Sequence, residues 1–274
     1  MKKADLHVRT ICSMGKVRPD EAVALAKKKG LAAIAIVDHE SVEGIQEAVE
    51  AGERYGVEVI PGVELMFEEA QREAHIIGYF IDWRNRALLT EISRAQAARG
   101  WRIQRTVEKL QSMGINITYD EVLGVAGRAS VIGRTHVAEL LVQKGVVKDV
   151  KEAFGKYLGY GKPAYIPRYQ LPISEALRPI FDAGGVPALA HPKFSEGIEL
   201  LPEFVKYGLV GLEVYHFSHS SADVKQLKSL AKKYGLVEVG GTDSSPKGAV
   251  GEVVVPYKVV EELRGGGRLR KLLK

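Results

Sequence analysis

The chain has 274 residues, of which 46% are hydrophobic and 27% are charged, and its formal net charge is +5. This length and hydrophobic content suit one large globular domain, or one domain that carries an insertion. The longest apolar run, Leu31–Val37, is far shorter than the roughly 20 residues that a membrane-spanning helix needs. Asp5 and His7 stand where an export signal would be apolar, and the single cysteine, Cys12, excludes an internal disulfide, so the sequence predicts a cytoplasmic protein with no membrane association.

The first 80 residues alternate between short apolar strands and amphipathic helices. Strands are expected at Ala4–Val8, Leu31–Val37, Val57–Ile60 and His75–Phe80, and helices at Pro19–Gly30 and Val42–Tyr55. Proline at the first turn and glycine after the last turn are typical helix boundaries. Pro61-Gly62 is expected to end the third strand, so that Glu64 follows it at the edge of the sheet.

The pattern changes between about Leu88 and Tyr165, where helical segments rich in arginine predict a helical insertion. Strand–helix alternation then resumes. Helices are expected at Ile173–Ala183 and Asp223–Tyr234, and strands at Val186–Ala190, Leu209–Tyr215 and Leu236–Val239. Repeated units of this length predict a parallel β/α architecture. The last eleven residues, RGGGRLRKLLK, are expected to form a frayed basic tail.

Histidines and carboxylates recur at the ends of different predicted strands. They are His7, Asp38, His39, Glu64, His191 and Asp243, and His75 stands at the entrance of a further strand. Because the carboxyl ends of the strands in a β/α barrel form one rim, we expect these side chains to lie together. A single one of them would more often be structural or solvated. The whole set predicts a zinc, manganese or iron site, in which Glu64 can bridge two ions that activate a water molecule.

Nine segments of the chain resemble the PHP (polymerase and histidinol phosphatase) superfamily over nearly the full length. They read ADLHVRT, LAAIAIVDHESVEGI, VIPGVEL, AHIIGYF, IGRTHVAELLVQKG, GYGKPAYIP, AGGVPALAHP, LEVYH and GGTD. The resemblance implies a distorted (β/α)7 TIM-like barrel of residues 1–87 and 166–274, with residues 88–165 as a helical insertion. It also implies two or three divalent metals at the rim and phosphomonoester hydrolysis. The insertion with its GRTH segment resembles the branch that acts on nucleotides and short RNA ends.

The resemblance also implies roles for individual residues. The implied metal ligands are His7, His39, Glu64, His75, His191 and Asp243. Arg134 in the GRTH segment would hold a phosphate group. His136 and His216 are further candidates for contact with the substrate, although His136 on a predicted helix can equally be packed. The implied partners are a small phosphate ester or nucleotide, or a short single-stranded RNA.

Three positions depart from the family pattern, because Arg9, Met14 and Ser245 stand where ligands are usual. Arginine cannot be deprotonated to bind a metal, and a thioether is a poor ligand for hard ions. By the family pattern, the site of Glu64, His75 and His191 stays whole, Arg9 disrupts a second site, and the third keeps only His39. We therefore expect fewer than the three metals of the family, or none.

Lys193 supports an alternative reading, because it follows His191-Pro192 where the family has a small residue. The apolar residues expected at the same rim are Met14, Val37, Met66, Phe67, Phe194 and Phe217. A lysine desolvated among them would be a nucleophilic amine that forms a Schiff base, as in an engineered or diverged retro-aldolase. A third reading is a non-catalytic protein in which Arg9 and Arg134 bind an anion. Across these readings Lys193, Arg134 and Arg9 are the candidate catalytic residues.

Overall fold

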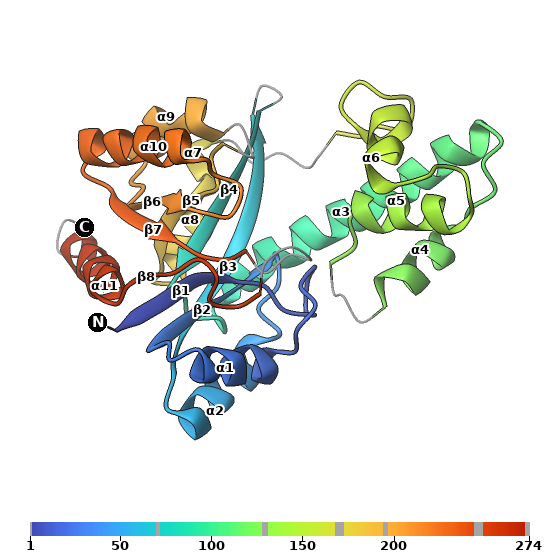
Figure 1. Ribbon diagram of the computed structural model, residues 1–274. Coiled ribbons are helices and arrows are strands. Elements are labelled where there is room, and N and C mark those ends of the chain that lie inside the picture. Colours follow the sequence, from blue (N-terminus) through green and yellow to red (C-terminus); the bar gives the residue numbers. More distant parts are fainter. Residues whose placement is uncertain are drawn as a thin grey trace. The chain divides into compact units, whose positions relative to one another are not determined.

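The computed structural model describes residues 2–69, 72–127, 131–167, 173–193, 197–243 and 249–271 (Figure 1). The chain divides into two compact units, Met1–Ile92 with Gln170–Lys274 and Ser93–Tyr169. Helix α3 (Arg86–Ser112) begins in the first unit and continues into the second. Among the described residues, no helix combines the length and the apolar character needed to cross a membrane.

The first unit is built on one eight-stranded sheet with the order β7-β6-β5-β4-β3-β2-β1-β8. The strands are β1 (Lys3–Val8), β2 (Ala33–His39), β3 (Glu58–Glu69), β4 (Arg72–Tyr79), β5 (Val186–Ala190), β6 (Gly211–Tyr215), β7 (Val237–Gly240) and β8 (Val255–Pro256). Most neighbours are parallel, but β4 runs antiparallel to both β3 and β5, and β8 runs antiparallel to β1. The sheet is therefore mixed rather than wholly parallel.

The reversal at β4 corrects the prediction of a parallel architecture. β3 and β4 form a hairpin with Glu69 opposite Arg72, and a connection this short can join only antiparallel strands. The entrance of β4 consequently lies at the same rim as the exits of the parallel strands. This direction brings His75, opposite Met66 on β3 and Ala190 on β5, to the rim.

The prediction that Pro61-Gly62 ends the third strand is also wrong, because β3 continues from Glu58 to Glu69. The amide of Glu58 donates to the carbonyl of Ala32, the residue before β2. Because backbone nitrogens alternate in direction along a strand, every second nitrogen after that of Glu58 faces β2, and the nitrogen of Pro61 faces the other way. Pairing with β4 begins only at Gly62, opposite Tyr79. The missing N–H of Pro61 thus costs no ladder bond, and Glu64 lies within a long strand.

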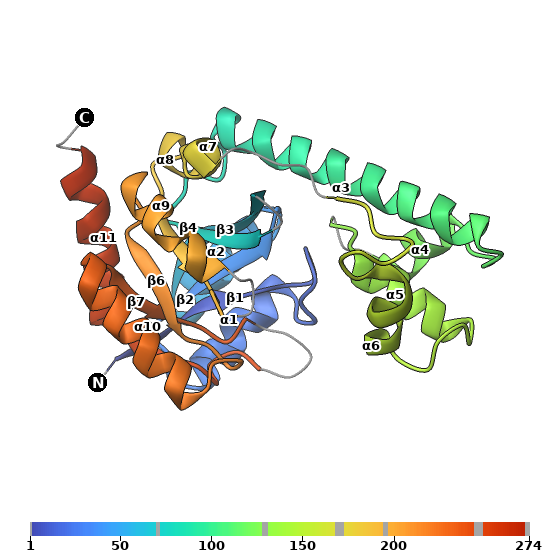
Figure 2. The ribbon, with the colours of Figure 1, turned by 90° about the horizontal axis from the view of Figure 1, so that it is seen from above.

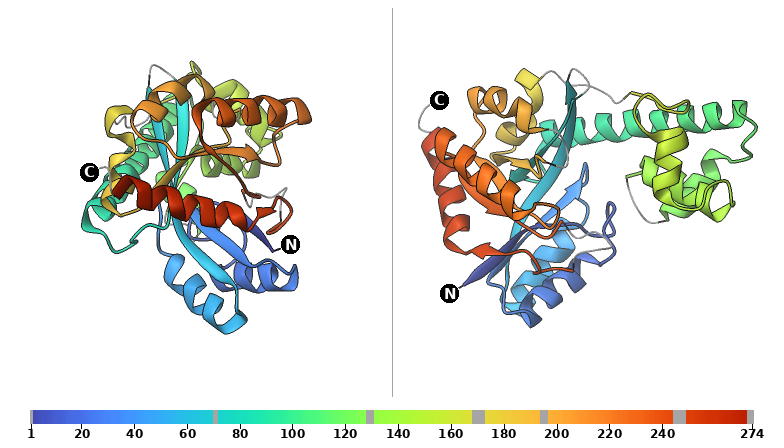
Figure 3. Two further views of the ribbon diagram at one scale, coloured as in Figure 1. Left: turned by 90° about the vertical axis from the view of Figure 1, so that its left-hand side faces the viewer. Right: turned by 45° about the horizontal axis from the view of Figure 1, so that its top comes forward.

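Helices cover the outside of the sheet, while small and branched side chains fill its inside. The helices of this unit are α1 (Pro19–Lys28), α2 (Ile45–Tyr55), α7 (Ile173–Ala176), α8 (Arg178–Asp182), α9 (Leu201–Lys206), α10 (Ser221–Tyr234) and α11 (Lys258–Lys271), with a 3-10 turn at Gly197–Leu200. Every residue of β2 is buried, as expected for a strand covered on both faces. The inner cluster includes Leu6, Val37, Ile60 and Tyr79. Figure 3 shows α1 and α2 side by side at one side of the sheet.

Two predicted segments differ from the structure in this unit. The helix expected at Ile173–Ala183 is two short helices, because Pro179 at the start of α8 has no N–H to continue the earlier helix. The basic tail is helical to Lys271, as part of α11. Arg264 of that helix pairs with Glu58 and lies over the ring of Phe80, so the start of the tail is packed against the sheet.

A close approach of two backbones joins the last parallel strand to the first. The amide of Asp243, just past β7, donates to the carbonyl of His7 at 2.7 Å. A Cβ atom on Gly241 would lie 2.2 Å from the nitrogen of His7, so only glycine fits there. This seam makes the sheet a nearly closed barrel and places the ends of β1 and β7 together.

The second unit is helical (Figure 2). Besides α3 it contains α4 (Tyr119–Ala126), α5 (Arg134–Gln143), α6 (Val150–Ala153) and a π-helical turn at Phe154–Leu158. Thr118 begins α4 by accepting a hydrogen bond from the amide of Glu121, a typical capping box. A separate core that includes Ile103, Leu110 and Leu141 holds these helices together.

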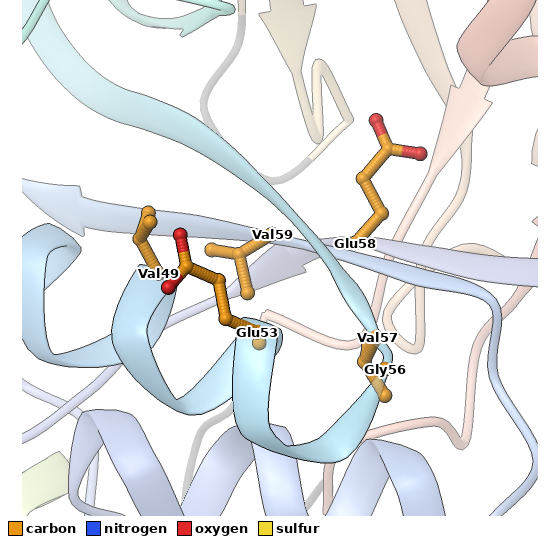
Figure 4. A pocket seen from close by; sticks show the side chains of 7 residues that line it. Val49, Glu53, Gly56, Val57, Glu58 and Val59 are labelled. Carbon is orange, nitrogen blue, oxygen red and sulfur yellow. The ribbon is translucent and has the colours of Figure 1, made fainter.

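A shallow pocket of about 350 Å³ lies where α2 turns into β3 (Figure 4). It is lined by Val49, Gly52, Glu53, Gly56, Val57, Glu58 and Val59. Glu58 and Glu64 are six residues apart on β3, which corresponds to about 20 Å along an extended strand. The pocket is thus at the opposite end of the strand from the histidines.

Candidate metal centre

Glu64 is the centre of the histidine cluster, and its side chain is fully buried. Its Oε1 atom lies 2.8 Å from His75 Nδ1 and 3.0 Å from His191 Nε2. Its Oε2 atom lies 3.3 Å from both His7 Nε2 and His39 Nδ1. Arg9 Nη2 donates a hydrogen bond to the same Oε2 atom at 2.8 Å. One carboxylate therefore faces four imidazoles and one guanidinium.

Two groups of potential metal ligands share this carboxylate. One is His7, Glu64 and His191, and the other is His39, Glu64 and His75; within each group the donor atoms lie within 4.8 Å of one another. The family pattern had grouped His75 with His191 instead. Imidazole nitrogens and carboxylate oxygens are suitable ligands for zinc, manganese and iron. The residues present therefore fit divalent metal, with Glu64 common to both groups.

The outer nitrogens of two of these rings contact further carboxylates. His7 Nδ1 lies 3.0 Å from Glu213 Oε1, and His75 Nε2 lies 2.6 Å from Glu73 Oε1. A carboxylate on the outer nitrogen of a histidine fixes the tautomer that leaves the inner nitrogen available to a metal. Both rings consequently direct one nitrogen toward Glu64.

Electrostatics keeps Glu64 ionised despite its burial. Burial alone disfavours the charged carboxylate, but the charges of Arg9 and His39 and the hydrogen bonds from His191 and His7 outweigh it and hold the pKa of Glu64 well below its ordinary value. Burial likewise disfavours a charged His7, yet Glu213 and Asp243 raise the pKa of His7 well above its ordinary value. The cluster is thus an array of opposite charges excluded from water.

Arg9 joins Glu64 to a second carboxylate, Asp243. Its Nε atom forms an ion pair with Asp243 Oδ1 at 2.8 Å, and His216 Nε2 lies 3.2 Å from Asp243 Oδ2. Burial would raise the pKa of Asp243, but the charges of Arg9 and His7 outweigh it and lower the pKa to about 2. The guanidinium therefore lies between two ionised, buried carboxylates.

Two of the candidate ligands have a strained backbone. His191 has a φ of +22° and Asp243 a φ of +47°, in a region that residues other than glycine rarely adopt. The amide of His191 donates to Glu213 Oε2 at 2.7 Å, and the amide of Asp243 is held by His7 across the seam. Strain of this kind persists where the surrounding contacts hold it, and it concentrates at functional sites.

Asp38 belongs to the expected constellation, but the structure gives it a different place. It accepts hydrogen bonds from the amide and hydroxyl of Thr10, both at 2.7 Å, and from the hydroxyl of Ser13. Burial raises the pKa of Asp38 to about 6, although these hydrogen bonds lower it. Asp38 therefore orders the loop that follows Arg9, and it belongs to neither group of potential ligands.

Lys193 is partly exposed and lies beside a carboxylate, unlike the desolvated lysine on which the amine hypothesis rests. Its Nζ lies 3.5 Å from Asp223 Oδ1, and 30% of the side chain is exposed. Phe217 is 44% exposed. Phe194, expected in the same enclosure, lies outside the described residues, as does Ser245.

The substrate-binding candidates lie in different units. His216 is buried at the rim, where its ring centroid is 5.2 Å from that of His191. Arg134 and His136 belong to α5 of the second unit. Arg134 Nη1 donates to the carbonyl of Leu158 at 3.1 Å, and the amide of Gly133 donates to His136 Nδ1 at 3.2 Å. His136 is thus packed at the start of its helix.

Glu213 and Glu73 also belong to the site, although neither was predicted as a site residue. The available signal was the charge of Glu213 within the apolar strand GLEVY, because a carboxylate in a buried strand requires a partner. For Glu73 the signal was its place two residues before His75, on the same face of the strand.

Several known proteins are similar to this chain over most of its length. The 3',5'-nucleoside bisphosphate phosphatase of Chromobacterium violaceum is 31% identical over 259 residues, covering 93% of this chain and 91% of that protein. The 5'-3' exoribonuclease of Haemophilus influenzae is 31% identical over 88% of this chain and 89% of its own. A crystal structure from Bifidobacterium adolescentis, of a protein classed as a metal-dependent phosphoesterase, is 31% identical with a TM-score of 0.85 and covers 96% of both chains.

These similarities confirm the expected distorted TIM-like barrel and the resemblance on which it rested. The model of the PHP domain matches residues 5–163, more than half of the sequence. The chain therefore belongs to the PHP domain family.

Proposed function

We propose that this protein is a metal-dependent phosphoesterase that hydrolyses phosphomonoesters of nucleotides or of short single-stranded RNA ends. The observation that carries the proposal is Glu64, a buried carboxylate contacted by four imidazoles that form two ligand groups around it. The similar phosphatase and exoribonuclease act on a nucleoside bisphosphate and on RNA, respectively, by their names. They support the substrate class.

In this proposal, His7, His191 and Glu64 hold one ion, and His39, His75 and Glu64 hold a second. Zinc, manganese or iron bound there would supply a Lewis acid and a water molecule of lowered pKa. Glu64 links the two ligand groups because it is a member of each of them. Glu213 and Glu73 keep the inner nitrogens of His7 and His75 directed toward it.

Arg9 supports a centre with fewer than three ions. Its guanidinium already forms ion pairs with both Glu64 and Asp243, at 2.8 Å from each. A divalent ion placed between the same carboxylates would meet a fixed positive charge that cannot be lost by deprotonation. Asp243 is therefore proposed as a partner of Arg9 rather than as a ligand in the resting protein.

The substrate phosphate is proposed to meet cationic and imidazole groups at the rim. His216 is the candidate nearest the cluster, because it contacts Asp243 and packs against His191. Arg134, on α5 of the second unit, is proposed separately as a phosphate-binding residue, as the resemblance of its GRTH segment implies. The amine hypothesis for Lys193 has no comparable support, since its ammonium is paired and partly exposed.

Glu64→Gln tests this function. The variant keeps the size of the side chain but removes the charge that both groups share, so metal content per chain and phosphatase activity on nucleoside monophosphates and bisphosphates should both fall, activity by at least about 100-fold. The matched control is Glu238→Gln on β7, whose carboxylate accepts the hydroxyl of Tyr215 at 2.9 Å. Unchanged turnover in Glu64→Gln, with the metal still bound, would refute the proposal.

A further inference from the structure

Glu213 is a buried carboxylate in the middle of β6, between Leu212 and Val214, and it is inaccessible to solvent. A carboxylate without partners at such a position would be strongly destabilising. Its two oxygens therefore lie inside the barrel, where each needs a hydrogen-bond donor.

The two oxygens of Glu213 contact two different candidate ligands. Oε1 lies 3.0 Å from Nδ1 of His7 on β1, and Oε2 accepts the backbone amide of His191 at 2.7 Å, just past β5. His7 Nε2 and His191 Nε2 both reach Glu64, at 3.3 Å and 3.0 Å. The group that unites His7, Glu64 and His191 is consequently held from behind by one side chain.

We propose that Glu213 is a positioning residue that fixes two metal ligands at once, an inference that rests on the metal-dependent function proposed above. Through Oε1 it keeps the proton of His7 on Nδ1 and leaves Nε2 for the metal. Through Oε2 it holds the backbone of His191 at its φ of +22°, from which the ring reaches Glu64. Outer carboxylates of this kind change metal affinity by about 10- to 100-fold.

Both contacts require an acceptor, and this makes Glu213→Gln a sharp test. The His191 amide is a donor, and His7 donates from Nδ1 when Nε2 binds a metal. Glutamine has almost the same shape but offers one acceptor oxygen and one donor nitrogen, so it can satisfy only one of the two. Either the ring of His7 or the backbone of His191 must lose its partner, whichever way the amide is oriented.

The experiment measures metal binding to the whole chain, stripped by chelator and titrated with Zn²⁺ or Mn²⁺ in a calorimeter. Glu213→Gln should weaken one ion by about 10- to 100-fold, and His7→Gln should weaken the same ion. The double variant should lose little more than His7→Gln alone, because the two residues act on one ion. Glu238→Gln on the neighbouring strand, whose carboxylate accepts from Tyr215, should bind metal as the unaltered protein does.

A second measurement is independent of metal. In nitrogen-15 NMR spectra of the metal-free protein, Glu213→Gln should shift either the ring N–H signal of His7 or the backbone amide signal of His191, with the circular dichroism spectrum retained. If the unaltered protein binds no metal while these signals move, the proposed function fails but the positioning contacts stand. Metal affinity and both signals unchanged in Glu213→Gln would overturn the inference.

Discussion

Replacing Arg9 by methionine should destabilise the metal-free protein and make its stability depend on divalent metal. Methionine keeps an unbranched apolar side chain but removes the guanidinium charge that lies 2.8 Å from both Glu64 and Asp243. Those carboxylates are almost inaccessible to solvent, so water cannot replace the lost partner. A divalent ion between the two carboxylates would supply the missing positive charge. The thioether of the introduced methionine is a poor ligand for such an ion and would not displace the carboxylates from it.

The size of the effect follows from the burial and from the pKa of Asp243. Removing one partner of a buried ion pair costs about 3 to 5 kcal/mol. For Asp243 alone, a pKa of about 2 instead of 3.8 corresponds to about 2 kcal/mol of stabilisation of the ionised form. Because the folded pKa is the lower one, this stabilisation is complete above the ordinary value near 4 and is lost as the pH falls toward 2. Without the charge of Arg9 the pKa of Asp243 should rise, so less of this stabilisation remains at neutral pH.

The assay is urea unfolding at neutral pH, in chelator and in saturating Zn²⁺ or Mn²⁺. In chelator, Arg9→Met should lower the free energy of unfolding by about 3 to 5 kcal/mol, and metal at 100 times its dissociation constant should restore about 2.7 kcal/mol. The control is Arg18→Met, whose exposed guanidinium pairs with Asp20 and Glu47 and should change stability by less than about 1 kcal/mol. Exposed ion pairs contribute up to about 1 kcal/mol. If the free energy of unfolding of Arg9→Met in chelator differs from that of the unaltered protein by no more than this, the argument is refuted.

Two further predictions concern the seam and the lysine. Gly241→Ala would place a Cβ atom 2.2 Å from the backbone of His7, and it should lower the free energy of unfolding by at least about 2 kcal/mol. The control is Gly124→Ala in α4, which has open space around it and should be neutral or stabilising. Equal melting temperatures of the two variants would contradict this prediction. Lys193→Met should change the free energy of unfolding by less than about 1 kcal/mol, because the ion pair of Lys193 with Asp223 is partly exposed. In the unaltered protein, borohydride should trap no carbonyl substrate on Lys193. A labelled Lys193 would show that the amine chemistry is real.

The sequence indicated the strands of the sheet well because their apolar runs are short and are bounded by polar residues, as in Leu31–Val37 before Asp38-His39. It did not indicate the direction of β4. A strand of given composition has the same pattern whether it runs parallel or antiparallel, and only the shortness of the turn after Glu69 distinguishes the two. Pro61 was misleading because its effect depends on which neighbour its nitrogen faces, and this is a property of the sheet.

The site was predictable where function requires an unusual residue, and less so where the residue has a supporting role. His7, His39, Glu64, His75 and His191 are brought together in the structure, because each lies at the same rim. Asp38 and Glu213 could not be separated by sequence alone, since both are single acids in apolar strands. Their roles depend on which groups reach their oxygens, Thr10 and Ser13 for Asp38 and two candidate ligands for Glu213.

The β3–β4 hairpin has a consequence for the order in which the centre assembles during folding. Glu64 and His75 are 11 residues apart, whereas His7 and Asp243, which meet at the seam, are separated by 236 positions (243 minus 7). Closing a short loop costs less chain entropy and is faster than joining distant segments. We therefore expect Glu64 and His75 to come together early with the hairpin, and the seam to form last. Variants of the seam such as Gly241→Ala should then accelerate unfolding and leave the refolding rate nearly unchanged, which stopped-flow kinetics can measure.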